Sequence, residues 1–161
     1  MYAACSSVTI RTATGLLLAG GAGQLIGFGP ADGEQRWHFP TAGLGASWRR
    51  LPGGGHGPVT ADGVLLHWTN EKTLQAIDLG SGKSLWLETF GATATLPPAV
   101  ADGTVYATAG GVCKALTLRG GKRIAQWPVD GEITDLAADS SGWYARVEND
   151  SVRAVNAPGG A

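Results

Sequence analysis

The residues with the clearest chemical potential lie in one glycine-rich stretch, residues 47–58, which reads SWRRLPGGGHGP. Two adjacent arginines, Arg49 and Arg50, follow Trp48, and His56 comes later in the same stretch. A guanidinium group can form paired hydrogen bonds with a carboxylate or a phosphate, so these residues suit an anionic ligand or partner. We expect these four side chains either to form a face for a ligand or partner, or to lie in a solvated loop.

Other residues of the types used in catalysis or metal binding show no useful spacing. His38, His56 and His67 form neither an HxxxH nor an HExxH pattern, and Cys5 and Cys113 form no CxxC pair. The chain also shows no serine, histidine and aspartate arrangement of a hydrolase. We therefore expect no catalytic, cofactor-binding or metal-binding residue in this chain.

A second glycine-rich stretch, AGGAGQLIG at residues 19–27, superficially resembles a loop that binds a dinucleotide. Its glycines follow the spacing G-x-G-x-x-x-G, and no helical pattern follows to supply the helix N-terminus that would hold a pyrophosphate. The corresponding positions of the repeats described below hold TNEK, AGG and END. This stretch is therefore predicted to be a hairpin between two strands.

The composition limits both the class of protein and its partners. The 161 residues carry a net charge of -1, 43% of them are hydrophobic and 16% are charged. Such a chain has neither the basic surface of a nucleic-acid-binding protein nor the composition of a disordered one. No apolar run reaches about 18 residues, so we expect no membrane span in this chain. The 26 glycines indicate many tight turns.

The elements that must position these residues repeat along the chain. Four segments each begin with a short apolar run and a turn, which ends at Gly15, Gly63, Gly103 and Gly142. A small residue follows inside a strand-like run of each segment, at Gly27, Ala76, Ala115 and Ala154. The interval between copies is about 40 residues, which is typical of one propeller blade.

Each copy contains up to four short strands. In the second copy these are PVTA, VLLHW, LQAIDL and SLWLETF. Asp62-Gly63 and Asp102-Gly103 are strong hairpin signals, because such tight turns need positive φ angles. Short strands of even spacing without helical periodicity predict an all-β fold, a β-propeller of four-stranded antiparallel blades. About four blades are present, which is half of a seven- or eight-bladed ring.

We expect the whole chain, residues 1–161, to form a single partial propeller. Its blades are predicted at residues 6–42, 57–92, 97–132 and 133–161, with an insertion loop at 43–56, and the last blade lacks its outer strand. The end blades of a half-ring expose apolar faces and an unpaired strand edge, both of which favour association. We expect either a homodimer that completes the propeller or covalent continuation in a longer chain.

The phrase AIDLGSGKSLW, residues 76–86, fits the pattern Ala-x-Asp-x-x-Thr-Gly-x-x-x-Trp, with Ser81 in the threonine position. Here the sequence resembles the pyrroloquinoline-quinone (PQQ) repeat family, whose propellers carry this quinoprotein-type tryptophan-docking motif in each blade. An indole that buries its ring and donates its N–H group to a carbonyl stabilises the contact between blades. The motif residues of the four copies are Ala76, Asp78, Gly82, Trp86, Gly33, Trp37, Ala115, Gly121, Trp127, Ala154 and Asn156.

The other copies depart from this motif. The first has Gly27 and Gly29 in place of alanine and aspartate, the third has Thr117 and a late tryptophan, and the fourth has Asn156 and no final strand. A propeller of Trp-Asp repeats has a similar period, but this chain contains no Trp-Asp dipeptide. The resemblance therefore covers nearly the whole chain, with one copy close to complete.

The resemblance implies two kinds of function. Catalytic members are quinoprotein dehydrogenases that use PQQ and calcium beside a vicinal cysteine pair, and this chain has no such pair. Other members are binding platforms, among them a lipoprotein of the bacterial barrel-assembly machinery and sensor domains of bacterial kinases. We expect a non-catalytic platform for a protein or small-molecule ligand, without a cofactor and in an extracytoplasmic, periplasmic or cell-surface location. The alternative is a fragment of a PQQ-dependent alcohol or sugar dehydrogenase.

Overall fold

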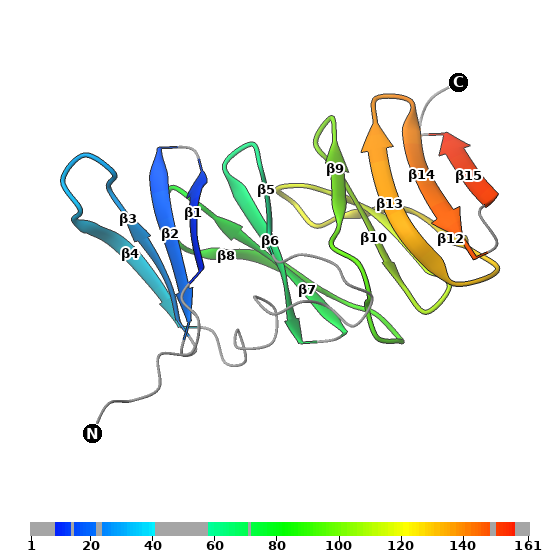
Figure 1. Ribbon diagram of the computed structural model, residues 1–161, viewed down its shortest axis with the longest axis horizontal. Helices are drawn as coiled ribbons and strands as arrows, with labels where there is room; N and C mark the ends of the chain where they lie inside the picture. The colour runs from blue at the N-terminus through cyan, green and yellow to red at the C-terminus, as the bar shows by residue number, and fades with distance from the viewer. Residues whose placement is uncertain are drawn as a thin grey trace.

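The computed structural model describes residues 9–13, 15–21, 24–40, 58–70, 72–148 and 151–156. Every regular element within these ranges is a β-strand, and the described residues contain no helix that could span a membrane. The strands form four separate sheets, which Figure 1 shows side by side in chain order. The predicted all-β fold, a partial propeller of antiparallel blades, is confirmed, and we call these sheets blades 1 to 4.

Consecutive strands are hydrogen-bonded neighbours in every blade. Blade 1 contains β1 (Thr9–Ala13), β2 (Leu16–Gly21), β3 (Gln24–Phe28) and β4 (Gln35–Pro40). Blade 2 contains β5 (Val59–Ala61), β6 (Val64–Asn70), β7 (Thr73–Asp78) and β8 (Ser84–Thr89). Blade 3 contains β9 (Ala99–Ala101), β10 (Thr104–Ala109), β11 (Val112–Thr117) and β12 (Arg123–Pro128). Blade 4 contains β13 (Ile133–Asp139), β14 (Gly142–Val147) and β15 (Ser151–Asn156).

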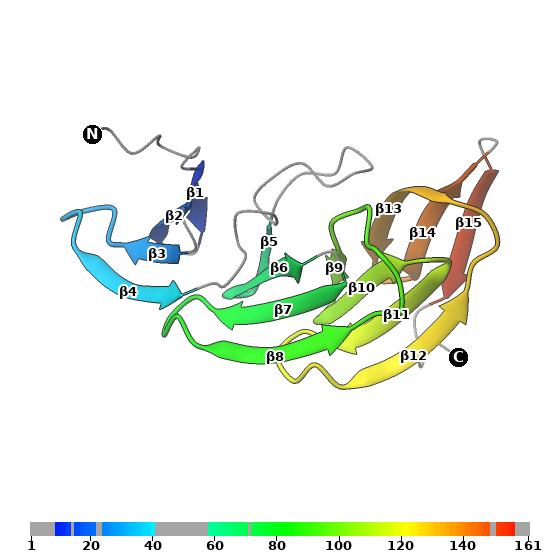
Figure 2. The same ribbon diagram turned by 90° about the horizontal axis from the view of Figure 1, so that it is seen from below.

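Within each blade, the strands follow one another from one side of the row of blades to the other. Seen from below, the fourth strands β4, β8 and β12 lie along one rim, and the first strands lie toward the opposite side (Figure 2). This is the radial order of a propeller, in which the first strand of each blade lies nearest the ring axis and the last lies outermost.

Two aspartate-glycine turns connect the first and second strands of blades 2 and 3. Asp62 and Gly63 have φ angles of 44° and 73°, and Asp102 and Gly103 have φ angles of 46° and 70°. Each pair alone separates the two strands, because Ala61 pairs with Val64 and Ala101 pairs with Thr104. Positive φ at both positions is the type I′ geometry that matches strand twist, so the predicted hairpins are confirmed.

The matching turn of blade 4 differs from its prediction by one residue. Asp139 pairs with Gly142, so the turn consists of Ser140 and Ser141, and Gly142 is the first residue of β14. Ser141 therefore takes the place that Gly63 occupies in blade 2. The repeat interval at this point is one residue shorter than the spacing of glycines suggests, because this hairpin uses two serines instead of an aspartate and a glycine.

The hydrophobic core is divided among the three seams between neighbouring blades. Between blades 2 and 3, side chains of β6, β7 and β8 pack with side chains of β10 and β11, and the cluster includes Leu66, Leu74, Trp86, Val105 and Leu116. The other two seams contain comparable clusters. A sheet that is covered on both faces needs apolar residues at consecutive positions. This explains why β7 and β11 are nearly continuous buried runs.

Candidate functional site

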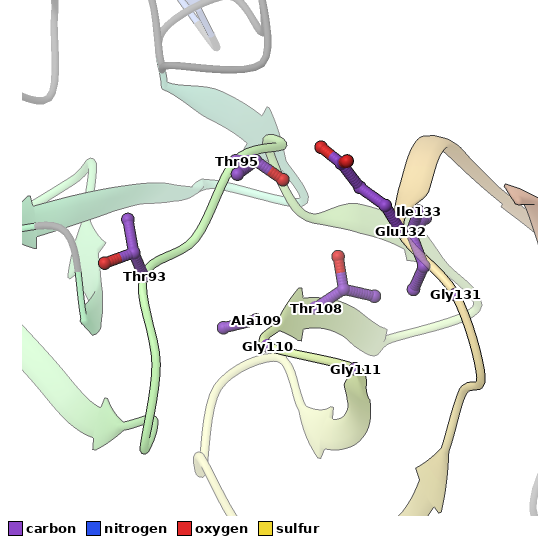
Figure 3. A pocket seen from close by; sticks show the side chains of 9 residues that line it. All are labelled: Thr93, Thr95, Thr108, Ala109, Gly110, Gly111, Gly131, Glu132 and Ile133. Carbon is purple, nitrogen blue, oxygen red and sulfur yellow. The ribbon is translucent and has the colours of Figure 1, made fainter. Parts of the chain in front are cut away.

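Three connections around blade 3 enclose a cavity of about 300 Å³. They are the link from β8 to β9, the hairpin between β10 and β11, and the link from β12 to β13 (Figure 3). In an up-and-down blade, these links and this hairpin fall on the same face of the propeller. The cavity is lined by Thr93, Thr95, Thr108, Ala109, Gly110, Gly111, Gly131, Glu132 and Ile133. We call it the threonine pocket.

The polar groups of the threonine pocket come from different connections. Figure 3 shows Thr95 on the first link and Glu132 on the second link facing the same space, with Thr108 at the end of β10 between them. Thr108 is only 4% exposed, so its hydroxyl lies at the bottom of the site, whereas Glu132 is exposed at its rim. Among the described residues that line the pocket, Glu132 alone is charged. The site therefore offers one carboxylate and several hydroxyls, which suit a ligand with cationic or hydrogen-bond-donating groups.

Glycines allow the three connections to approach so closely. Gly110 and Gly111 form the two-residue hairpin with φ angles of 57° and 75°. A Cβ atom at Gly110 would collide with the Ala92 side chain, and one at Gly131 would lie 2.6 Å from Cγ1 of Val147. The Val129 amide also donates to the Gly111 carbonyl at 2.7 Å, which joins the hairpin to the second link. Backbone close approach thus shapes the pocket, and larger residues at these positions would force the links apart.

A second cavity of about 410 Å³ lies beside the same hairpin and shares Ala109 and Gly110 with the threonine pocket. Its charged lining residue is Lys114, which is 9% exposed. The Lys114 ammonium donates to Oε1 of Glu88 at 2.7 Å and to the Thr89 carbonyl at 2.9 Å. It also lies 4.3 Å from the centroid of the Phe90 ring. These partners already neutralise the cation, so Lys114 stabilises the seam between blades 2 and 3.

Cys113 and His67 do not line the threonine pocket, although Cys113 is the cross-strand partner of the lining residue Thr108. Cys113 is fully buried, and this burial raises the pKa of its thiol to about 12. His67 is also buried, and burial lowers its pKa to about 4. Within the described ranges, no group of three or more histidine, cysteine, aspartate or glutamate residues could hold a metal ion.

The sequence-predicted ligand face, Trp48, Arg49, Arg50 and His56, lies outside the described residues and stays a prediction. The motif tryptophans Trp37 and Trp86, by contrast, are both placed in seams.

The Trp37 Nε1 donates to the Leu79 carbonyl at 2.7 Å, and the Trp86 Nε1 donates to the Leu118 carbonyl at 2.8 Å. Each indole therefore links its own blade to the next one. The turns that accept them contain Gly82 and Gly121, and a Cβ atom at either glycine would collide with the indole ring.

Trp127 does not take the position of the other two motif tryptophans. Trp37 pairs with Gly27 and Trp86 pairs with Ala76, whereas Trp127 pairs with Cys113, and Ala125 pairs with Ala115. Trp127 therefore lies two cross-strand pairs farther along β12 than the position that Trp86 occupies in β8. Its ring packs against Trp143 of blade 4, with 5.7 Å between the centroids. The third copy thus joins its neighbour by ring packing.

The remaining motif residues lie in turns and strands. Asp78 accepts hydrogen bonds from the Ser81 amide at 2.9 Å and the Ser81 hydroxyl at 2.8 Å, which fixes the turn after β7. These bonds, with one from Arg119 of blade 3, hold the pKa of Asp78 below its usual value. Ala154 is exposed on β15, unlike the buried Ala76 and Ala115, and Asn156 ends that strand.

Sequence reasoning missed the threonine pocket because its residues lie where the repeats differ. Thr108 follows an ordinary strand pattern, and Glu132 lies in a short link between two predicted blades. Two signals could have found them. The link GATATLP, residues 91–97, concentrates threonines beside a Gly-Gly hairpin, and β6 has Trp68 where β10 has Thr108.

Solved structures with the same fold include members of several functional classes. BamB from Moraxella catarrhalis matches with a TM-score of 0.63 and 16% identity, over 90% of this chain and 45% of that chain. The computationally designed Ika4 protein matches with a TM-score of 0.70 and 16% identity, over 94% of this chain and 91% of that chain. The quinohemoprotein alcohol dehydrogenase from Comamonas testosteroni matches with a TM-score of 0.56 and 19% identity, over 81% of this chain and 22% of that chain.

These identities establish the fold alone, and this chain spans less than half the length of the BamB structure. No curated protein matches the chain. A family model, described as outer membrane protein assembly factor BamB, matches residues 21–160 and so includes strands of all four blades. The predicted resemblance to PQQ-like repeat propellers is thereby confirmed, and the chain belongs to the family described as outer membrane protein assembly factor BamB.

Proposed function

We propose that this chain is a non-catalytic propeller segment that binds a protein partner at the threonine pocket, as an assembly or sensor module. The observation that carries the proposal is the pocket itself, which is lined by Thr93 and Thr95 of the first link, Thr108 at the end of β10 and Glu132 of the second link. Loops held by a rigid scaffold are common places for binding residues. The description of the family as an assembly factor supports a protein partner rather than a metabolite.

The chemistry of the pocket selects a basic side chain. A lysine ammonium has three donors and no acceptor, and the pocket supplies a carboxylate and hydroxyl oxygens. The buried hydroxyl of Thr108 lies below the carboxylate of Glu132 in Figure 3, so an ammonium between them would meet acceptors on two sides. The proposed ligand is therefore a lysine of an extended segment on the partner.

The family description also supports a proposal about the location. The description concerns outer membrane proteins, which supports an extracytoplasmic location, on the periplasmic side or at the cell surface. Detection of the full-length gene product in a periplasmic or membrane fraction would support this location. Its recovery with cytosolic markers alone would contradict it.

The test compares two labelled synthetic peptides that are identical except for a central lysine or glutamine. Fluorescence anisotropy with the purified chain should show that the lysine peptide binds roughly fivefold more tightly, as one partly exposed ion pair provides. Glu132→Gln should remove this preference. Asp130→Asn is the matched control, because it removes an equal charge from an exposed residue that does not line the pocket.

Two results would overturn the proposal. One is an absence of lysine preference in the unaltered chain, or an equal loss of preference in both variants. The other is retention of PQQ with calcium by the purified chain, followed through the cofactor's absorbance, together with dye-linked oxidation of an alcohol or sugar. That second result would favour the alternative, a segment of a PQQ-dependent quinoprotein dehydrogenase, whose fold this chain shares.

A further inference from the structure

The cavity of about 410 Å³ beside the β10–β11 hairpin has one wall formed by strands of blade 3. Val112 and Lys114 lie two positions apart on β11, so their side chains point to the same face of the sheet. Gln126 is the cross-strand partner of Lys114 on β12 and shares that face. All three residues line the cavity. This wall therefore places an ammonium group and an amide group on neighbouring strands.

A second wall comes from the link between β8 and β9. Phe90, Gly91 and Ala92 contribute to it, and the Phe90 amide donates to the Lys72 carbonyl at 2.8 Å, which fixes the start of the link on blade 2. A Cβ atom at Gly110 would collide with the Ala92 side chain, so the link and the hairpin already lie in close contact. The cavity is therefore bounded by backbone that is held in place on both sides.

The Lys114 ammonium keeps donor capacity for a ligand. A lysine ammonium has three N–H donors, and two oxygens accept from this one, Oε1 of Glu88 at 2.7 Å and the Thr89 carbonyl at 2.9 Å. No third oxygen or nitrogen acceptor for it lies among the described residues. Lys114 is 9% exposed and lines the cavity, so an oxygen placed there is within its reach.

Gln126 adds a second donor at the rim of the cavity. Its Oε1 accepts a long hydrogen bond from Nη1 of Arg123, at 3.4 Å. Its Nε2 has no acceptor in the part of the chain that the structure describes, and the residue is exposed. Directly opposed residues of an antiparallel pair have Cβ atoms about 5 Å apart, so one oxygen can accept from both Lys114 and Gln126.

The ion pair beside the cavity favours an uncharged ligand. The side chains of Lys114 and Glu88 are only 11% and 22% exposed, and their charges cancel. A ligand carboxylate would add a second negative charge next to this neutral pair, and a ligand ammonium would lie next to the ammonium of Lys114. Burial of an unpaired charge is unfavourable, whereas a carbonyl oxygen accepts the same hydrogen bonds without one.

We propose that this cavity, which we call the Lys114 pocket, binds a small uncharged molecule that has a carbonyl group on a short apolar chain. The carbonyl oxygen accepts from Nζ of Lys114 and Nε2 of Gln126, and the chain lies against Val112 and Ala92. A volume of about 410 Å³ is in the range of small-molecule sites. The Lys114 pocket shares Ala109 and Gly110 with the threonine pocket, but its ligand does not depend on the function proposed for that pocket.

Three probes of similar size and different head group test this proposal: pentanamide, pentylamine and pentanoate. In an NMR titration of the isotope-labelled chain, pentanamide should shift the backbone amide of Lys114 and the side-chain amide of Gln126. We expect affinity in the millimolar range, because the probe has few atoms. Read at these two resonances, pentylamine and pentanoate should each bind at least about fivefold more weakly. Shifts of Thr95 and Glu132 report binding to the threonine pocket separately.

Variants of the chain test the two donors. Lys114→Met keeps an apolar stem and removes the ammonium, so it should abolish the preference for pentanamide over pentylamine. Gln126→Ala should weaken pentanamide binding about threefold, read at the Lys114 amide. Gln35→Ala is the matched control, because it removes an exposed glutamine from β4, the outermost strand of blade 1. This control should bind pentanamide like the unaltered chain.

Several outcomes would overturn the proposal. These are resonances of Lys114 and Gln126 that stay unmoved by pentanamide, equal binding of the three probes, and pentanamide binding that neither Lys114→Met nor Gln126→Ala changes. Gln126→Ala keeps the test decisive if Lys114→Met does not fold, because Gln126 is exposed. Loss of the lysine preference at Glu132 has no bearing on this result.

Discussion

Protonation of His67 should destabilise the seam between blades 1 and 2 at mildly acidic pH. His67 is 1% exposed in β6, on the sheet face that also carries Leu65. Its Nε2 lies 2.9 Å from Oε1 of Gln75, and the Gln75 amide donates to the Ser84 hydroxyl at 2.9 Å. This neutral network fits a buried imidazole, whereas an imidazolium would be a charge removed from water.

The size of this destabilisation follows from the pKa of the His67 imidazole. Burial lowers the pKa of His67 from its ordinary 6.5 to about 4, and the hydrogen bond with Gln75 offsets only part of this effect. The unfolded chain therefore binds more protons than the folded chain between these values. Stability is fully present above pH 6.5 and falls as the pH drops toward 4. At a pH of about 4.5 the free energy of unfolding should be lower by about 2.5 kcal/mol from this group alone.

Asp32 and Asp78 titrate at lower pH, so their effect on stability can be separated from the effect of His67. Hydrogen bonds from the Glu34 amide and from Ser81 lower the pKa values of Asp32 and Asp78 below 3.8. Stability from these two groups is lost only as the pH falls below that value. Between about pH 7 and pH 4.5, His67 should therefore dominate over both of them.

Urea unfolding followed by tryptophan fluorescence at several pH values tests this prediction. His67→Gln keeps a side chain that can hydrogen-bond to Gln75 but cannot titrate, so it should lose most of the pH dependence in this window. His38→Gln is the control, because His38 is exposed on β4. A His67→Gln variant that loses stability between pH 7 and 4.5 as steeply as the unaltered chain would refute the reasoning.

Two further predictions concern the seams. Trp86→Phe leaves the Leu118 carbonyl without the indole donor and should cost about 1 to 3 kcal/mol in urea unfolding, whereas Trp143→Phe removes a buried Nε1 that has no partner among the described residues and should cost less; equal losses would contradict this. Because the Cys113 pKa is about 12, iodoacetamide should modify this thiol at neutral pH only as fast as the chain opens, and alkylation at the rate of an exposed cysteine would contradict its placement.

The fold could be predicted from the sequence because its signals are local and repeated. Asp62-Gly63 and Asp102-Gly103 fix two hairpins through their own backbone preferences, without help from distant residues. The spacing from Ala76 to Trp86 likewise reflects one turn and one cross-strand pair. Such features depend on residues that are close in the sequence, so they can be predicted from the sequence alone.

Registers between strands were harder to predict, as Trp127 illustrates. The turns after β7 and β11 have the same hydrogen bonds, and β8 and β12 are equally long, so Trp127 lies two positions farther along a strand of unchanged length. A shift of two residues keeps a side chain on the same face of the sheet. Trp127 therefore still faces blade 4, but Ala125 takes the position that a docking tryptophan would need.

The threonine pocket could not be predicted, because it exists only through contacts between separate connections. Thr95, Thr108 and Glu132 are far apart in sequence, and none belongs to a motif. Their convergence depends on the seams on both sides of blade 3, which place the two links next to the Gly110-Gly111 hairpin. The relative positions of these residues are therefore set by the packing of the blades and not by the sequence of any single repeat.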